Sequence, residues 1–375
     1  MKVVIAIDSL KGSLSSMEAG EAIKAGILDV FKETTVKILP LADGGEGTVE
    51  ALVEGMDGQV EILSVTGPLG EKVNAHYGLI PHKNMAIIEM AQAAGLPLVP
   101  TEERNPLKTT TYGVGELIKD AIVKGSRHFI IGIGGSSTND AGLGMLQALG
   151  FEFYDENQKL VGNAGRDLER IRSFSTENAL SQLKECHFKI ACDVNNPLFG
   201  PKGAAYVYGP QKGATEEIVE SLDAGLRNFS NVVDPSLADV SGTGAAGGLG
   251  YAFVSLLRGS LEPGIDIIMN EIRLEEELKN ADFVITGEGR MDFQTSMGKA
   301  PIGVAKLAKK HHVKVIGLAG SVTEDATACN DAGIDSFFSI QNNVIPLEEA
   351  MKKDVAAKNM KATTVQIFNL IKALQ

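Results

Sequence analysis

Residues 3–13 read VVIAIDSLKGS, an apolar run that ends at Asp8 and passes into a short polar turn. Behind this turn, residues 15–31 carry apolar side chains at helical spacing, with Ser15 placed to cap the first turn. The pattern then repeats, because residues 36–42 form a second apolar run and a helical pattern resumes at Thr48. Alternation of strand, loop and helix is typical of a parallel sheet, so this stretch predicts an α/β fold.

The same alternation returns near the other end of the sequence. Apolar runs typical of short strands occur at 282–287 (DFVITG), 313–320 (VKVIGLAG) and 335–340 (DSFFSI), with helical patterns between and after them. Residues 1–65 alone supply too few strands for a sheet. We therefore predict one Rossmann-like, doubly wound parallel sheet built from residues 1–65 and 275–375 together.

The residues between these two segments are expected to form a second domain, inserted into the first. The chain has 375 residues, more than one ordinary core accommodates. Residues 66–274 are richer in Gly and Pro and alternate less regularly between strand and helix. A mixed α/β domain is therefore predicted for this insertion.

Composition excludes several classes of protein. The formal net charge is −13, and an acidic surface repels a phosphate backbone, so we expect no nucleic-acid partner. No apolar stretch approaches the roughly 20 residues of a membrane span, and no cleavable leader is recognised, so we expect no membrane partner. The three cysteines (Cys186, Cys192 and Cys329) are scattered, which fits a reducing compartment. The expected location is cytoplasmic.

Five polar loops follow predicted strands, and ligands of parallel sheets gather at the carboxyl ends of strands. The loops are DSLKGS (8–13), DGGEGT (43–48), GSSTNDAG (135–142), DVNNPLFGP (193–201) and GEGRMDFQTSMGKAP (287–301). None is a Walker A loop, because Gly298-Lys299 is followed by Ala300. Gly242, Gly244 and Gly247 match the dinucleotide pattern GxGxxG, but no buried strand precedes them, so that site is only an alternative.

The third loop lies in GIGGSSTNDAGLG, residues 132–144, where glycines precede a run of hydroxyl side chains. It can be a tight turn into a helix that begins at Asn139, with Asp140 in the first turn. Alternatively, its bare amides and the N-terminus of that helix bind phosphate. On the second interpretation the residues that bind the phosphates of a nucleotide are Gly134, Gly135, Ser136, Ser137, Thr138 and Asn139.

Together, these loops resemble those of the type I glycerate kinase family. The matching segments are IAIDSLKGSLSS (5–16), LPLADGGEGT (39–48), GIGGSSTNDAGLGMLQALG (132–150), CDVNNPLFGPKGAAYVYGPQKGA (192–214), GTGAAGGLGYAF (242–253), LEPGIDII (261–268) and ITGEGRMDFQTSMGKAPIGVA (285–305). The resemblance implies ATP-dependent phosphorylation of D-glycerate to a phosphoglycerate. It also implies a two-domain fold that includes a Rossmann-like domain.

Phosphoryl transfer requires charge neutralisation, a metal ion and a group that receives the hydroxyl proton. Lys11 is expected to pair with the glycerate carboxylate or the transferred phosphoryl group, and Arg290 offers a planar fork for either. Asp193 is the predicted base and Asp292 the predicted Mg²⁺ ligand, although the two roles are interchangeable. The predicted substrate-binding residues are Asp8, Ser9, Gly12, Asp43 and Glu46. Since the loops come from both domains, we expect the active site in the cleft between them.

Two other functions fit part of the same pattern. A nucleotide-cofactor oxidoreductase would use the GTGAAG segment, residues 242–247. A non-catalytic sensor of glycerate-type hydroxy acids would use the same fold without turnover. The kinase interpretation implies D-glycerate and ATP as small-molecule partners and Mg²⁺ as the metal. The sequence leaves open the oligomeric state and whether the 2- or the 3-hydroxyl group is phosphorylated.

Overall fold

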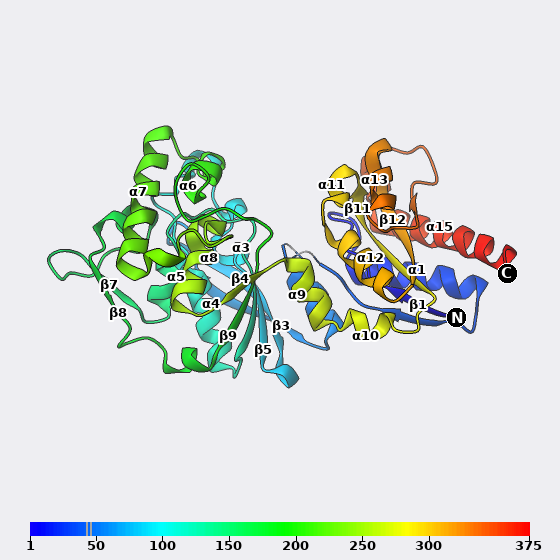
Figure 1. Ribbon diagram of the computed structural model, residues 1–375, viewed down its shortest axis with the longest axis horizontal. Coiled ribbons are helices and arrows are strands. Elements are labelled where there is room, and N and C mark those ends of the chain that lie inside the picture. The colour runs from blue at the N-terminus through cyan, green and yellow to red at the C-terminus, as the bar shows by residue number, and fades with distance from the viewer. Residues whose placement is uncertain (43, 46) are drawn as a thin grey trace. The chain divides into compact units, whose positions relative to one another are not determined.

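The computed structural model describes residues 1–42, 44–45 and 47–375, and the chain divides into two compact units. Unit 1 comprises Met1–Asp43, Glu50–Asp57 and Ile265–Gln375, and unit 2 comprises Gly44–Val49 and Gly58–Gly264 (Figure 1). Each unit is built on its own sheet.

Unit 1 contains a five-stranded parallel sheet with the strand order β13-β12-β11-β1-β2. The strands are β1 (Lys2–Ile5), β2 (Thr35–Ile38), β11 (Phe283–Met291), β12 (Lys314–Val322) and β13 (Ser336–Ser339). Val4 of β1 is in register with Val284 of β11, so both ends of the sequence share one sheet, as predicted. The order of the strands along the chain reverses between β1 and β11, which makes the carboxyl ends of these two strands the switch point of the sheet.

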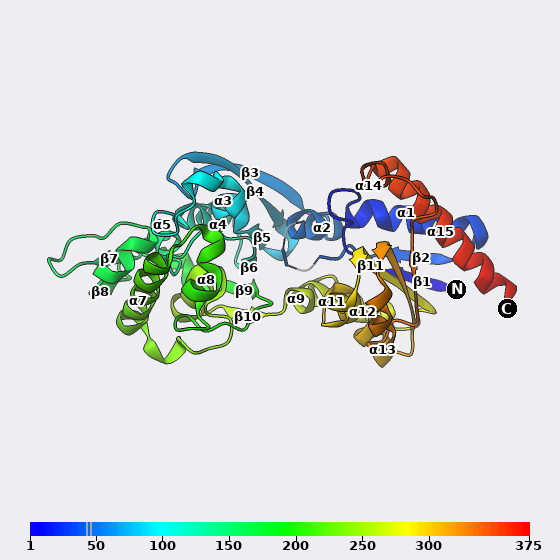
Figure 2. The same ribbon diagram turned by 90° about the horizontal axis from the view of Figure 1, so that it is seen from above.

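Helices cover both faces of this sheet. On one face α1 (Ser16–Val30) packs against α15 (Lys353–Ala373), and α12 (Ala300–Lys310) packs on the other (Figure 2). Ser15 begins α1 as the sequence predicted, because its hydroxyl accepts a hydrogen bond from the Glu18 amide and its own amide donates to the Glu18 carboxylate. The remaining helices of this part of the chain are α2 (Thr48–Gly55), α9 (Gly264–Glu271), α10 (Leu274–Leu278), α11 (Phe293–Ser296), α13 (Ala328–Asp331) and α14 (Leu347–Ala350).

Unit 2 contains a six-stranded mixed sheet with the strand order β10-β9-β6-β5-β4-β3. Its strands are β3 (Gln59–Thr66), β4 (Lys72–Ile80), β5 (Met85–Glu89), β6 (His128–Gly132), β9 (His187–Ala191) and β10 (Ser260–Glu262). Strands β5, β6, β9 and β10 are parallel, and β4 pairs antiparallel with both β5 and β3. The predicted α/β fold, with a Rossmann-like parallel sheet and a mixed α/β insertion, is confirmed.

The boundaries of the two units differ from the residues chosen on the sequence. We placed the first boundary at residue 65, yet β3 pairs with β4 in unit 2. The reason is a tight turn between the two strands, in which the Gly67 amide donates to the Glu71 carbonyl, and a turn this short keeps both strands in one sheet. At the other boundary, unit 1 resumes at Ile265 and not at residue 275.

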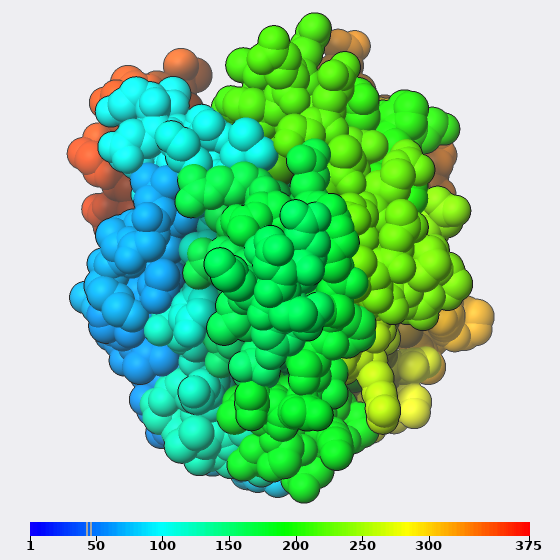
Figure 3. Space-filling model, turned by 90° about the vertical axis from the view of Figure 1, so that its left-hand side faces the viewer, coloured from blue at the N-terminus to red at the C-terminus, as the bar shows by residue number. Residues whose placement is uncertain are grey.

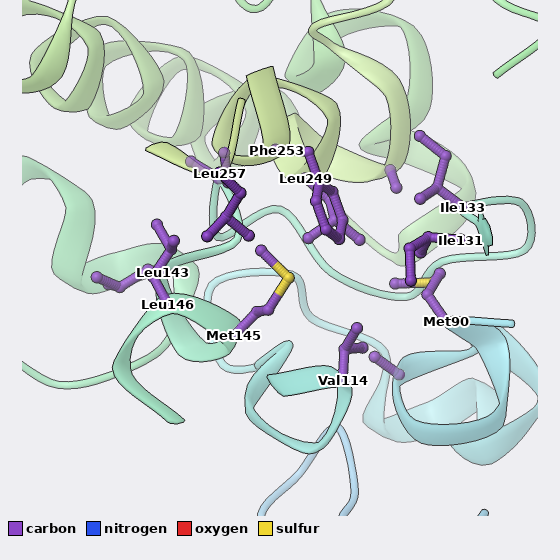
Figure 4. Close-up of a cluster of buried hydrophobic side chains, with 14 of the residues drawn as sticks. Met90, Val114, Ile131, Ile133, Leu143, Met145, Leu146, Leu249, Phe253 and Leu257 are labelled. Carbon is purple, nitrogen blue, oxygen red and sulfur yellow. The ribbon is translucent and has the colours of Figure 1, made fainter. Parts of the chain in front are cut away.

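The core of unit 2 lies between its sheet and its helices. Ile131 of β6 packs in one apolar cluster with Leu146, Leu249 and Phe253, so three segments of the chain, β6, 143–148 and 245–256, contribute to it (Figure 4). The helices are α3 (Ala91–Ala94), α4 (Tyr112–Val123), α5 (Leu143–Ala148), α6 (Ala204–Tyr208), α7 (Glu216–Val233) and α8 (Ala245–Leu256). A short antiparallel sheet of two strands, β7 (Glu152–Tyr154) and β8 (Ser173–Ser175), lies at the end of unit 2 that Figure 3 views. Among the described residues, no helix is both long enough and apolar enough to span a membrane.

Candidate active site

A cavity of about 790 Å³ lies in unit 1 at the switch point of the parallel sheet. Its lining residues follow the carboxyl ends of β1, β11, β12 and β13, the edge at which ligands of such sheets bind. The polar part of the lining consists of Asp8, Ser9, Lys11, Ser13, Glu288, Arg290, Asp292, Lys299, Ser321, Gln341 and Asn343. Five residues that the sequence analysis assigned to the site therefore line one cavity: Asp8, Ser9, Lys11, Arg290 and Asp292.

Asp8 is held in place by the backbone of the sheet. Its amide donates to the Gly287 carbonyl at 3.0 Å, which continues the pairing of β1 with β11 beyond the end of β1. One carboxylate oxygen accepts a hydrogen bond from the Ser9 amide at 2.6 Å, and the side chain is buried. Gly12 follows in the same loop with a φ of 77°, a conformation that favours glycine. The backbone pairing thus fixes the Asp8 carboxylate in the lining of the cavity.

Asp292 has a structural task besides the metal-binding role predicted for it. It is the N-cap of α11, where Oδ1 accepts from the Thr295 amide at 3.2 Å. Its other oxygen, Oδ2, lies 3.7 Å from Nε of Arg290. No group of three or more His, Cys, Asp or Glu side chains among the described residues is arranged to bind a metal ion. A Mg²⁺ ion at Asp292 would therefore need further oxygen ligands from a bound phosphate.

Glu288 is a cavity carboxylate that the sequence analysis missed. One carboxylate oxygen accepts from Oγ1 of Thr295 at 2.7 Å, and the other lies 3.5 Å from Nζ of Lys299. Burial raises the pKa of Glu288, while the contacts with Thr295 and Lys299 oppose this rise. The residue lies in the quoted GEGRMD segment, but nothing in that pattern distinguishes it from Asp292 as the more buried carboxylate.

The glycine-rich loop of unit 2 only partly follows the prediction. Helix α5 begins at Leu143 and not at Asn139. The carboxylate of Asp140 occupies the amides at that end, accepting from Gly142 and from Gly144, each at 3.2 Å, and also from the Thr111 amide at 2.9 Å. Burial raises the pKa of Asp140, and these hydrogen bonds oppose the rise. A protein carboxylate therefore binds at the helix end that the sequence interpretation assigned to phosphate.

Only the first part of this loop is open to a ligand. Gly134 and Gly135 are exposed, and a Cβ atom added at Gly134 would have no atom within 4 Å. Ser136, Ser137, Thr138 and Asn139 are buried. The loop thus combines both of the properties that the sequence left open, namely close packing in its second part and exposed backbone in its first.

A buried lysine lies behind this loop. Nζ of Lys212 donates to Oγ of Ser136 and to the Thr138 carbonyl, both at 2.7 Å. Sequence analysis did not single out Lys212, although it belongs to the quoted segment 192–214. Its presence explains why Ser136 and Thr138 lie inside the protein, because the lysine needs their oxygen atoms as acceptors.

Asp193, the predicted base, belongs to unit 2 and follows the carboxyl end of β9. It is exposed, and Oδ1 accepts from the Gly264 amide at 3.1 Å. Lys11 and Arg290 belong to unit 1, so the three predicted catalytic residues come from both units. Asp43 and Glu46, predicted to bind substrate, lie outside the described residues.

The GTGAAG segment has no dinucleotide-binding geometry. It lies at the start of α8, where Gly247 has a φ of 67°, and no strand leads into it. A Cβ atom at Gly247 would lie 2.1 Å from the Thr138 carbonyl oxygen, so this glycine permits close packing of two backbone segments. The chain itself fills the space that a cofactor pyrophosphate would need, which removes the basis of the oxidoreductase alternative.

The fold is that of an α/β protein with a ligand cavity at the switch point of its parallel sheet. Carboxylates and cations line this cavity together. Residues 3–372 match the glycerate kinase family. The chain is 47% identical to a glycerate kinase of Bacillus subtilis (strain 168), covering 99% of this chain and 98% of the relative. It is 46% identical to a glycerate 2-kinase of Escherichia coli (strain K12), covering 94% and 93%. A crystal structure from Salmonella typhimurium LT2, assigned as glycerate kinase 2, matches with a TM-score of 0.92 and 45% identity over 100% of this chain and 98% of that one.

The chain belongs to the glycerate kinase family. This confirms the resemblance drawn from the seven sequence segments and the prediction that the protein is an enzyme, a kinase of this family.

Proposed function

We propose that this protein transfers the γ-phosphoryl group of ATP to D-glycerate in a Mg²⁺-dependent reaction. The observation that carries the proposal is the cavity of unit 1, where Lys11, Arg290 and Lys299 line the same space as Asp8 and Glu288. The relatives support it, because glycerate kinases are 47% and 44% identical to this chain over nearly its whole length. The cations can form ion pairs with the carboxylate of glycerate and with the phosphates of ATP. The carboxylates can accept hydrogen bonds from the hydroxyl groups of glycerate and can coordinate the metal ion.

Within this proposal the residues divide into groups that neutralise charge, position the substrate and accept a proton. Lys11 and Arg290 neutralise the substrate carboxylate and the transferring phosphoryl group, because charge developing on phosphoryl oxygens is stabilised by fixed cations. Asp8, Ser9 and Gly12 position glycerate. Asp193 receives the proton of the attacking hydroxyl group.

The metal and the phosphates require further ligands. Asp292 fits as one Mg²⁺ ligand through Oδ2, since Oδ1 already caps α11. The ion would supply charge neutralisation of the phosphates. Gly134 and Gly135 are the exposed members of the loop assigned to phosphate, and we propose that their backbone binds phosphate oxygens. The buried members, Ser136 to Asn139, then shape the loop.

A coupled assay of ADP release tests the proposed function. The purified full-length protein is mixed with Mg-ATP and a panel of small hydroxy acids, and the product is identified by phosphorus and carbon NMR as the 2- or the 3-phosphate. D-Glycerate should release ADP, and a chelator of Mg²⁺ should stop the release. Glycerate binding without ADP release would support the sensor alternative and overturn the kinase proposal.

We also propose a cytoplasmic location. All three cysteines are unpaired, and burial raises the pKa of Cys186 to about 11, which keeps that thiol protonated and unreactive. A chain that leaves its thiols free and shielded suits a reducing compartment. Cell fractionation with an antibody against the protein tests this location.

A further inference from the structure

We propose that the apolar part of the unit 1 cavity lining binds the nucleoside of the nucleotide, with the phosphates directed toward Lys11, Arg290 and Lys299. This inference rests on the proposed function, and it names the part of the molecule that recognises the phosphoryl donor. The sequence analysis assigned phosphates to a loop but gave no site for the base and ribose.

The cavity is larger and more apolar than glycerate requires. At about 790 Å³ it falls in the range of pockets that enclose whole cofactors, roughly 300–1,000 Å³. Glycerate is a three-carbon acid whose every carbon carries oxygen, so it has little apolar surface to bury. The apolar part of the lining consists of Leu10, Ile340, Val344, Ile345, Leu347, Ala350, Met351 and Ala356. An aromatic base with two apolar faces matches such a wall.

Part of the apolar wall is exposed. Val344 is fully exposed and Leu347 is 72% exposed, and both residues line the cavity. Large apolar side chains gathered around a cavity and rimmed by polar groups mark a ligand-binding groove. Gln341 and Asn343 line the same cavity, and their amides can both donate and accept hydrogen bonds with the edge of a base or with a ribose.

The same lining also carries the charges that a nucleotide requires. Arg290 and Lys299 contact carboxylates only at 3.7 Å and 3.5 Å, and both cations are substantially exposed. Long, solvent-exposed ion pairs contribute little to stability, so these side chains can turn toward phosphate oxygens at small cost. The lining of the cavity thus supplies both apolar side chains for a nucleoside and cations for its phosphates.

Calorimetric titration of the full-length protein with ADP, and separately with adenosine, tests the assignment. The wall variant is Leu347→Asp, which should fold normally because Leu347 is exposed and because an acidic residue is favourable in the first turn of α14. We expect it to weaken ADP and adenosine at least about 10-fold, since it removes apolar contact with the base. Arg290→Met should weaken ADP by a similar factor and leave adenosine binding unchanged. Leu370→Asp is the matched control, because Leu370 is 58% exposed on α15 of the same unit and does not line the cavity.

The outcomes separate this inference from the proposed function. If the wild-type protein phosphorylates glycerate and Leu347→Asp binds ADP as tightly as the Leu370→Asp control, the nucleoside site is wrong and the kinase proposal stands. The inference is also overturned if Leu347→Asp raises the KM for glycerate alone. ADP binding that the wall variant weakens, in a protein that fails to phosphorylate glycerate, would support the nucleotide site and refute the proposed substrate.

Discussion

Nζ of Lys212 lies 2.7 Å from Oγ of Ser136, and both groups are buried in unit 2. The Lys212 side chain also donates to the Thr138 carbonyl at 2.7 Å and is only 2% exposed. Burial lowers the pKa of Lys212 to about 7, and the nearby Asp140 carboxylate opposes this lowering. The ammonium group that holds the glycine-rich loop in shape therefore titrates near neutral pH.

Because of this pKa, the stability of unit 2 should depend on pH through Lys212. A lysine in the unfolded chain keeps its proton up to about pH 10.5. Between pH 7 and that value the unfolded state therefore binds more protons than the folded state, and stability rises with pH by at most about 1.4 kcal/mol per unit. Below pH 7 both states are protonated and the cost of burying the charge is constant.

Thermal unfolding at pH 6, 7, 8 and 9 measures this effect. The difference between the Tm of the wild-type protein and the Tm of Lys212→Met should stay constant from pH 6 to 7. From pH 7 to 9 this difference should change in favour of the wild type. Lys119→Met is the matched control, since Lys119 is an exposed residue on α4 of the same unit. Parallel Tm profiles for the wild type and Lys212→Met would contradict the assigned titration.

The sequence was sufficient to predict the sheet of unit 1 and five of the residues that line its cavity. The apolar runs at 3–7 and 283–286 contain most of strand β1 and the start of β11, and polar residues that follow parallel strands meet at one edge. The sequence next to Asp8 and Arg290 was therefore enough to predict that both residues lie at the site. Each apolar run predicts a strand, and the general topology of parallel sheets predicts that the loops after these strands lie at one edge.

The features that the sequence analysis missed depend on tertiary contacts. Helix α5 begins at Leu143 because Asp140 is also bonded to Thr111, a residue far away in sequence. Lys212 reads as an ordinary surface lysine in sequence, because only the packed loop places acceptors around it. Glu288 was missed for a similar reason, since its burial and its bond to Thr295 are set by the fold of the loop after β11.

Bulk at Gly134 should block phosphate more than it disturbs the fold. A Cβ atom there has no neighbour within 4 Å, and Gly134 does not have a left-handed backbone, so the Cβ atom of Gly134→Ala or Gly134→Val meets no other group. If this backbone binds phosphate oxygens, the KM for ATP should rise while the Tm stays near that of the wild type. Gly134→Ala should give a smaller rise. Equal losses of ATP affinity and of stability would instead indicate that the glycine serves only the turn.

Removal of the Lys11 charge should subtract one electrostatic contribution to phosphoryl transfer. Loss of one preorganised group of this kind costs on the order of 10²- to 10³-fold in rate, and we expect that loss in kcat/KM for Lys11→Ala. Lys11→Arg should recover little, because a planar guanidinium does not replace a compact ammonium. Lys24→Ala is the control, since Lys24 lies on α1 of the same unit, away from the cavity lining. Activity close to the wild type in Lys11→Ala would place the charge-neutralising group elsewhere.

The identity of the base can be decided between Asp193 and Glu288. Asp193→Asn keeps the shape of the side chain but cannot accept the hydroxyl proton, so it should lower kcat by roughly 10²- to 10⁴-fold and leave the KM for glycerate nearly unchanged. If excess Mg²⁺ restores the rate of this variant, Asp193 is a metal ligand instead. Glu288→Gln should then be the variant with the large loss of kcat.

The pH profile of kcat distinguishes the same two residues independently. Burial raises the pKa of Glu288, so a reaction that needs its ionised form is lost, as the pH falls, at a higher pH than an unperturbed glutamate would give. If Glu288 is the base, the acid limb of the wild-type profile should lie above pH 4.5, and the activity left in Glu288→Gln should lack that limb. If Asp193 is the base, Glu288→Gln should keep the acid limb of the wild type and Asp193→Asn should lose it. A limb that both variants retain would exclude both carboxylates and leave Asp8 and Asp292 as the groups to substitute next.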